Sequence, residues 1–179
     1  MFTGGEFEPG DIGNFIGRAI RSNQPLPENR AGAARLAAAM NDATRPPAPQ
    51  PVPLVPPLAR TISGRSYALD ANPIDLKSFA LSFPGAEEAQ LQLELSDQRD
   101  GPRPVGLDGV PRVSPNGRFG LPVAVSGAWE SNSTFVLDYN EVGNINAYRF
   151  RLTFSDSRVT VELTERSGLV EARFRGRSR

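Results

Sequence analysis

Residues 127–168, GAWESNSTFVLDYNEVGNINAYRFRLTFSDSRVTVELTERSG, decide the fold of this chain. Within them, residues 149–154 (RFRLTF) and 159–164 (VTVELT) alternate polar and apolar side chains. Successive side chains of a strand point to opposite faces of a sheet, so each segment predicts a strand with one buried face and one solvated face. The intervening residues 155–158 (SDSR) have turn composition, which predicts a hairpin.

Further strands are expected on both sides of this hairpin. Residues 134–139 are rich in β-formers, and the chain then turns at 140–144 (NEVGN), because Asn and Gly tolerate positive φ. Shorter runs of the same kind predict strands at 60–69 (with a bulge at Gly64), 78–83, 90–95, 123–129 and 171–176. We expect a tight reversal at Asp100-Gly101, and irregular edge strands and loops in the Gly- and Pro-rich residues 101–122. Eight to ten strands with short connections indicate an antiparallel barrel or sandwich.

The first 57 residues have a different composition. Residues 11–22 predict a helix capped by Asp11, and residues 28–43 predict a weaker, Ala-rich helix capped by Asn29. The apolar stripe of the first helix consists of Ile12, Phe15, Ile16, Ala19 and Ile20. Seven prolines in residues 45–57 predict an extended linker to a β domain at 58–179. The alternative for the linker is a docking site for an SH3-like module at residues 53–56 (PLVP).

Composition limits the function. Twenty basic and twenty acidic residues balance in 179, which gives no electrostatic case for nucleic acid or a membrane surface. The chain has no His, the commonest general base and metal ligand, and no Cys, so the compartment stays open. No apolar run is long enough to span a bilayer. The acidic, Gly-rich start is not a signal peptide, so we expect either a cytoplasmic chain or a start that is not the true beginning of the protein.

The sequence contains no familiar catalytic constellation, and we predict no catalytic, cofactor-binding or metal-binding residue. The motifs S-x-x-K, K-T-G, G-x-S-x-G and the phosphate-binding G-x-x-x-x-G-K-[ST] do not occur, and Lys77 is the single lysine. An acidic group around one turn could suggest Ca²⁺, but its spacing differs from that of an EF-hand and favours a solvated hairpin tip. This group contains Asp138, Asn140, Glu141, Asn144 and Asn146.

Three residues are candidates for contact with a ligand or a partner. Trp129, the single Trp, suits either core packing or ligand stacking. Arg149 is a candidate on the central hairpin. Arg166 opens a basic C-terminus with Arg173, Arg175, Arg177 and Arg179, which suits the outer face of a last strand or contact with an acidic partner.

Several short segments together resemble the C-terminal β domain of bacterial serine hydrolases of the class C β-lactamase, penicillin-binding-protein-like and D-aminopeptidase family. The segments are 63–67 (SGRSY), 71–73 (ANP), 127–130 (GAWE), 135–138 (FVLD), 141–146 (EVGNIN), 148–150 (YRF), 152–154 (LTF) and 165–168 (ERSG). The resemblance implies a mainly β fold, an antiparallel meander closing into a lipocalin-like β-barrel of about eight strands. It also implies that residues 1–44 resemble the end of a catalytic domain whose nucleophile and other motifs would lie upstream of Met1.

Three functions are open at this point. The first, implied by the resemblance, is a non-catalytic accessory domain that shapes the active site of an amide- or ester-hydrolysing catalytic domain, in the same protein or on a separate chain; such proteins are often periplasmic or secreted. The second is a free-standing, hollow lipocalin-like barrel that binds a small apolar ligand between Phe, Leu and Val side chains. The third is an independent enzyme that uses a carboxylate pair among Glu130, Asp138 and Glu162.

Overall fold

The computed structural model describes residues 9–20, 24, 27–45, 47–96, 98–117, 120–144 and 146–179. They belong to two compact units, Met1–Pro46 and Pro47–Arg179. No helix among the described residues is long and apolar enough to cross a membrane.

The first unit contains two helices, α1 (Pro9–Ala19) and α2 (Arg30–Thr44). The Asn29 side chain caps α2 as predicted, accepting a hydrogen bond from the Gly32 N–H at 2.8 Å. The predicted cap of α1 is wrong, because this helix already includes Pro9 and Asp11 lies inside it. Proline suits a first turn, where its missing N–H has no intrahelical partner anyway. Of the predicted apolar stripe, the side chains of Ile12 and Phe15 lie outside the described part.

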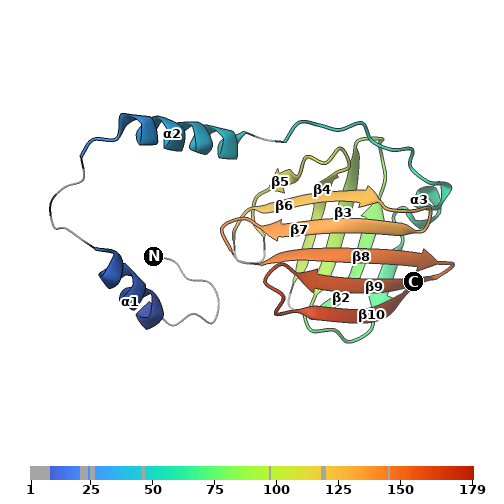
Figure 1. Cartoon of the computed structure of the whole chain (residues 1–179). Coiled ribbons are helices and arrows are strands. Elements are labelled where there is room, and N and C mark those ends of the chain that lie inside the picture. Colours follow the sequence, from blue (N-terminus) through green and yellow to red (C-terminus); the bar gives the residue numbers. More distant parts are fainter. Residues whose placement is uncertain are drawn as a thin grey trace. The chain divides into compact units, whose positions relative to one another are not determined.

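The second unit is a β-barrel with one short helix, α3 (Pro57–Ile62) (Figure 1). Its strands are β1 (Ser66–Leu69), β2 (Leu76–Ser82), β3 (Glu88–Leu95), β4 (Arg99–Gly106), β5 (Arg112–Ser114), β6 (Val123–Trp129), β7 (Thr134–Glu141), β8 (Ala147–Ser155), β9 (Arg158–Glu165) and β10 (Glu171–Ser178). The central hairpin predicted from alternation is β8–β9, with Ser155 paired to Arg158 across its turn.

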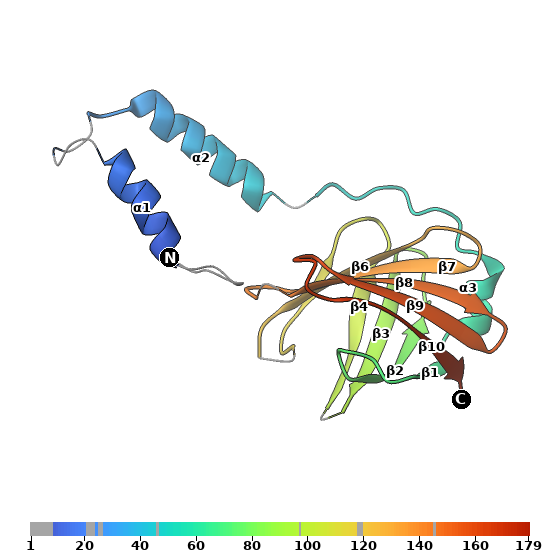
Figure 2. The ribbon, with the colours of Figure 1, turned by 60° about the horizontal axis from the view of Figure 1, so that its bottom comes forward.

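The described strands form a closed, mixed barrel. They are ordered β4-β3-β2-β1-β10-β9-β8-β7-β6-β5, and every pair of neighbours in this order is antiparallel. The first and last strands in the sequence, β1 and β10, are paired, with Tyr67 opposite Ser178. A parallel bridge between Gly106 of β4 and Ser126 of β6 completes a ring of nine strands, with β5 attached to β6. Strands β6–β10 run across β2–β4, which lie behind them in Figure 1 and beside them in Figure 2. The predicted mainly β barrel is therefore confirmed, with nine barrel strands where about eight were expected.

Two local predictions are wrong. Residues 60–69 do not form one strand, because Pro57 starts helix α3, whose Ala59 and Ile62 are buried, and Gly64 turns the chain at φ 75° before β1. Asp100-Gly101 is not the reversal between β3 and β4 but lies inside β4. The Asp100 side chain is buried there, so this Asp-Gly pair places a polar group inside the barrel and does not form a turn.

Residues 47–56 of the Pro-rich stretch form neither helix nor strand, and they lie in the same unit as the barrel. The Gln50 N–H donates to the Asp108 carbonyl at 2.8 Å, and Val52 packs against the barrel core. Pro56 of the PLVP match is buried, whereas the neighbouring Leu54 is 99% exposed. Residues 47–57 are therefore held on the barrel, and one of the two prolines that an SH3-like module would need is covered.

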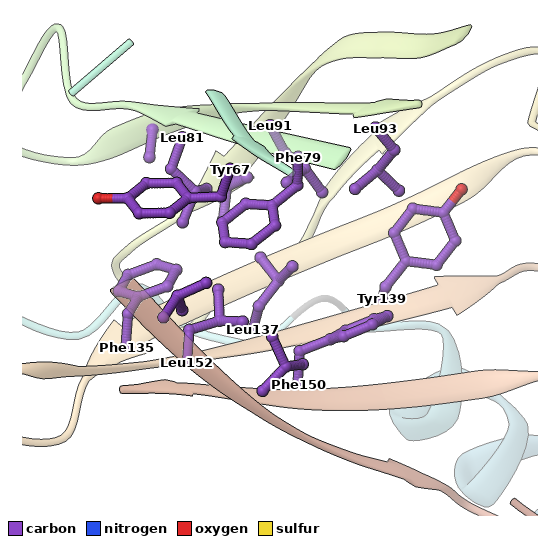
Figure 3. Packing of buried hydrophobic residues seen from close by; sticks show 14 of the residues in the cluster. Tyr67, Phe79, Leu81, Leu91, Leu93, Phe135, Leu137, Tyr139, Phe150 and Leu152 are labelled. Carbon is purple, nitrogen blue, oxygen red and sulfur yellow. The ribbon is translucent and has the colours of Figure 1, made fainter. Parts of the chain in front are cut away.

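Side chains fill the middle of the barrel. Tyr67 stacks on Phe79 at a ring-centroid distance of 5.4 Å, and Phe154 meets the Tyr67 ring edge-on at the same distance. Figure 3 shows this packing, with Tyr67 and Phe135 toward one end of the cluster and Tyr139 and Leu93 toward the other. The interior void at this level measures only about 10 Å³. The expected Phe, Leu and Val lining is present, but it packs against itself and leaves no continuous hollow.

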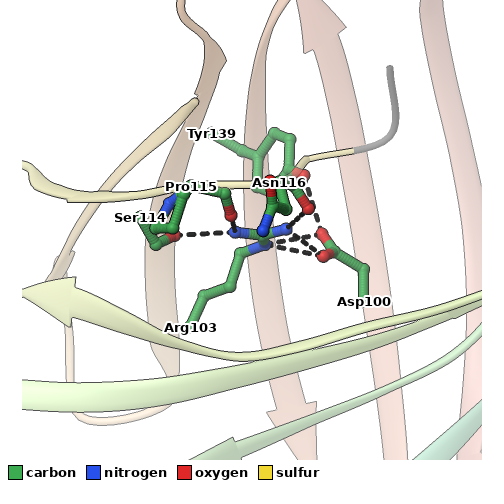
Figure 4. Close-up of polar contacts among 6 residues, drawn as sticks. All are labelled: Asp100, Arg103, Ser114, Pro115, Asn116 and Tyr139. Atoms are coloured by element: carbon green, nitrogen blue, oxygen red, sulfur yellow. Dashed lines mark hydrogen bonds and ion pairs between the residues drawn. The ribbon is translucent and has the colours of Figure 1, made fainter. Parts of the chain in front are cut away.

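A buried polar cluster occupies the seam where β4 approaches β6 and β7 (Figure 4). The Arg103 Nε donates to both Asp100 carboxylate oxygens, at 2.7 and 2.8 Å, and one terminal nitrogen adds a further contact to the same carboxylate. The other guanidinium hydrogens reach Ser114 Oγ at 2.7 Å and the carbonyls of Pro115 at 3.0 Å and Asn116 at 2.7 Å. All five guanidinium N–H groups thus have acceptors.

Tyr139 extends the cluster across the barrel, because its hydroxyl donates to Asp100 Oδ2 at 2.9 Å. Asp100, Arg103 and Tyr139 are each less than a tenth exposed. Since β4 and β6 share a single bridge among the described residues, this cluster adds a buried polar connection at the seam.

We predict that Arg103→Met destabilises the protein by about 3–5 kcal/mol, because it leaves the Asp100 carboxylate buried without its cation. Urea unfolding followed by circular dichroism measures the change. Arg149→Met is the matched control, since it breaks an ion pair with Asp138 whose partners are both largely exposed and should cost at most about 1 kcal/mol. Equal losses in the two variants would contradict the structural role of the seam cluster.

Candidate functional site

A cavity of about 210 Å³ lies at the end of the barrel where the β1–β2 loop, the end of β3 and the β7–β8 turn meet. Its apolar wall consists of Ile74, Leu76, Leu93, Leu95 and Phe150. Its polar wall consists of Tyr139, Glu141, Asn144, Asn146 and Tyr148. The site therefore combines an apolar surface with hydrogen-bonding groups that come mainly from one strand pair, β7–β8.

The cavity is shallow because the barrel below it is packed. Leu76, Leu93 and Phe150 line both the cavity and the 10 Å³ void beneath it, so they form its floor. In Figure 3, Leu93 and Phe150 lie near Tyr139 at this end of the core cluster. A ligand in the cavity would meet the floor without reaching the centre of the barrel.

Glu141 lies in this cavity and not at a solvated hairpin tip, so the sequence prediction for this residue is wrong. Along β7 the inward positions are Leu137, Tyr139 and Glu141, and Glu141 is only 6% exposed. One of its carboxylate oxygens, Oε2, accepts a hydrogen bond from the Asn144 side-chain amide at 3.0 Å. The period-two spacing from Leu137 is the signal that could have placed Glu141 inside.

Tyr139 links the cavity to the seam. Burial, and then the neighbouring Asp100 carboxylate, raise the pKa of the Tyr139 phenol far above its usual range, so this hydroxyl stays a proton donor to Asp100. Arg103 is saturated by its five acceptors and does not line the cavity. The Arg103 guanidinium is therefore bound by groups of the protein and is not available to a ligand in the cavity.

Tyr148 forms the opposite side of the polar wall. Its hydroxyl accepts a hydrogen bond from the Asn146 side chain at 2.7 Å, and its ring lies 6.3 Å from that of Phe150. These contacts fix the orientation of both rings at the edge of the cavity.

The three residues predicted to contact a ligand or partner lie elsewhere. Arg149 and Arg166 come together in a depression of about 440 Å³ that also includes Ser126, Asp138 and Thr164. Arg149 pairs there with Asp138 at 2.7 and 3.0 Å, and this carboxylate raises the pKa of the guanidinium. The depression lies on the outer face of the sheet, because Ser126, Asp138, Arg149 and Thr164 are register partners at outward positions of β6–β9.

Trp129 packs at the other end of β7 from Glu141, since its register partner is Phe135. Its indole lies 5.2 Å from the Phe135 ring and 5.5 Å from the Phe83 ring, and it lines a small crevice together with Val52 of the Pro-rich stretch. This is the packing role that the sequence left open beside ligand stacking. The Trp129 Nε1 is buried and has no hydrogen-bond acceptor among the described residues.

The carboxylates considered for catalysis are engaged in exposed ion pairs. Arg151 Nε donates to Glu130 at 2.8 Å, and its Nη1 donates to Glu162 at 3.0 Å. Asp138 pairs with Arg149 as described above. Within the described part of the chain, no group of three or more acidic side chains is arranged to hold a metal ion.

Comparison with known proteins gives little to add to this geometry. No protein-family model and no curated protein matches the sequence. Among solved structures, the chain is similar to a fatty acid-binding protein from brain tissue of Drosophila melanogaster, solved without citrate inside. The similarity has 15% sequence identity and a TM-score of 0.49, and covers 65% of this chain and 98% of that chain. The barrel assignment rests on the strand pairing of this chain, and the resemblance to a hydrolase domain stays a prediction.

We predict that the stability of the protein falls as the pH rises above about 10, and that Tyr139→Phe makes this fall less steep. Because the folded state raises the pKa of Tyr139, the unfolded state releases this proton first, so the stabilisation is present below the unfolded pKa and is lost above it. Urea unfolding at several pH values from 8 to 12 measures both slopes. An unchanged slope in Tyr139→Phe would contradict the buried Tyr139–Asp100 hydrogen bond.

Proposed function

We propose that the barrel at residues 47–179 binds a small, mainly apolar ligand in the cavity at its β7–β8 end. The observation that supports this most is the composition of the cavity, in which Leu76, Leu93 and Phe150 form an apolar floor below a polar edge held by internal hydrogen bonds. Ligand sites are concave and mostly apolar, with a few fixed polar groups that orient the ligand.

The volume sets the size of the ligand. About 210 Å³ lies below the roughly 300–1,000 Å³ of sites for drug-sized molecules. Since the core is packed beneath the floor, the ligand is a small molecule or one end of a longer one. This differs from the hollow barrel expected from the sequence, in which an apolar ligand would lie in the interior between Phe, Leu and Val side chains.

The affinity follows from the apolar surface available. Burying six methylene-sized groups contributes about 5 kcal/mol, and the loss of translational and rotational freedom offsets much of it. A six-carbon ligand with no specific polar contact should therefore bind weakly, with a Kd of about 10 mM or higher.

We predict that 1-hexanol binds saturably and shifts the backbone amide resonances of Leu76, Leu93 and Phe150 in a ¹H–¹⁵N NMR titration. Leu95→Trp should abolish these shifts, because the larger side chain fills the cavity that Leu95 lines. Leu169→Trp is the matched control, since Leu169 is exposed and outside the cavity, and should leave binding unchanged. Shifts that do not saturate, or that persist in Leu95→Trp, would sink the proposal.

The second candidate is an accessory domain of a serine hydrolase, and the first unit is the feature that favours it. Its helical segments expose four apolar side chains, each of them more than half exposed. Ile16 lies on α1, Ile20 directly follows α1, and Leu36 and Met40 lie on α2. Such residues would suit contact with a catalytic domain. Reading the coding sequence upstream of Met1 tests this candidate, because an in-frame S-x-x-K motif with a second catalytic motif would support it and unrelated sequence would count against it.

A further inference from the structure

The cavity carries a negative charge at its edge. Among the described residues that line it, Glu141 is the one charged side chain, and it is only 6% exposed. Its contact with Asn144 supplies a neutral hydrogen-bond donor but no neutralising cation. A carboxylate removed from water favours a positively charged neighbour.

The protein offers no obvious cation for this carboxylate in the described part. Arg103 is held by Asp100, Ser114 and two backbone carbonyls, so its charge is already compensated. Lys77, the single lysine, is exposed on β2 and does not line the cavity. The seam pair is neutral as a unit, which leaves the charge of Glu141 uncompensated.

A second buried carboxylate reinforces the negative potential. Glu165 of β9 lies directly opposite Tyr148 of β8, and Tyr148 lines the cavity. Glu165 is 6% exposed, and its Oε1 has no hydrogen-bond donor among the described residues. The Ser167 hydroxyl and N–H bond to its other oxygen and hold the pKa of this carboxyl below its usual range, so its charge is retained.

The aromatic side chains of the cavity suit the same kind of ligand. Tyr139 and Tyr148 border the space above the apolar floor, and Phe150 is part of that floor. The faces of aromatic rings carry negative potential and attract organic cations. A ligand with an apolar body and a cationic head would thus meet favourable surfaces at both ends.

We infer that the cavity selects a small organic amine, whose ammonium group lies at the Glu141 carboxylate and whose apolar body lies on Leu76, Leu93 and Phe150. This inference rests on the proposed ligand-binding function. It also means that a carboxylate-headed ligand is disfavoured, because its charge would face Glu141 and because Arg103 is engaged elsewhere.

Three probes that share one apolar body test the inference: hexylamine, 1-hexanol and hexanoate, titrated into the full chain at pH 7 and followed by the amide resonances of the cavity. Hexylamine is protonated at this pH, as a lysine side chain is. It should bind about tenfold more tightly than 1-hexanol, as expected of hydrogen bonds to a charged group, and hexanoate should bind at least about tenfold more weakly.

Glu141→Gln identifies the residue responsible, because glutamine keeps the size and can still accept the hydrogen bond from Asn144. In this variant hexylamine and 1-hexanol should bind within about twofold of each other, since the charge is lost. Glu130→Gln is the matched control. It also removes one negative charge, but from an exposed ion pair outside the cavity, and should keep the roughly tenfold preference.

The outcomes separate the two proposals. If none of the three probes binds, the proposed function fails. If 1-hexanol binds and hexylamine binds no better, ligand binding stands and the amine inference is overturned. The inference is likewise overturned if the amine preference survives in Glu141→Gln. Should Glu141→Gln not fold, the ranking of the three probes on the unaltered chain still decides.

Discussion

The buried contact between Asp100, Arg103 and Tyr139 is the interaction on which the closure of the barrel depends. Antiparallel pairing carries the sheet continuously from β4 round to β6, but those two terminal strands share one bridge, at Gly106 and Ser126. Arg103 adds a buried link at the seam, because its five donors reach acceptors on β4, on β5 and in the residues after β5. A charge buried this deeply is tolerated only because every donor is satisfied.

The same contact determines which polar groups are available to a ligand in the cavity at the β7–β8 end. Because Arg103 and Tyr139 both bind Asp100, the interior cation and one interior hydroxyl serve the fold and are not offered to a ligand. The charge left at the cavity is that of Glu141, with Glu165 buried behind Tyr148. The closure of the barrel and the proposed preference for a cationic head are thus two consequences of one polar arrangement.

Local patterns were sufficient for much of the fold and little of the site. Strands β8 and β9 follow from alternation, because inward and outward side chains differ in polarity through residues 149–154 and 159–164. Helix α3 was missed because its short sequence has no periodicity, and its burial against the barrel decides its structure. The Asp100–Gly101 pair has the composition of a turn, but in the strand the buried Asp100 binds Arg103 and also Tyr139, which is thirty-nine residues away.

The site depends on that kind of long-range contact. Glu141 could have been placed inside by counting from Leu137, but the polar residues that follow it suggested a solvated tip. No local pattern relates Arg103 to Asn116 or brings Ile74 to Tyr148. Arg149 was selected on the central hairpin and Arg166 as the start of the basic C-terminus, and the two do lie together, although on the outer face.

The most direct test of the central claim is ¹⁵N NMR of the arginine guanidinium groups in the unaltered chain. With all five N–H groups hydrogen-bonded in the interior, Arg103 should give separate Nη–H signals that exchange slowly with solvent, unlike exposed arginines such as Arg173. Adding hexanoate should leave these signals unchanged. A single, rapidly exchanging Arg103 signal would contradict the account, since the seam would then be open and its cation free to meet an acidic ligand.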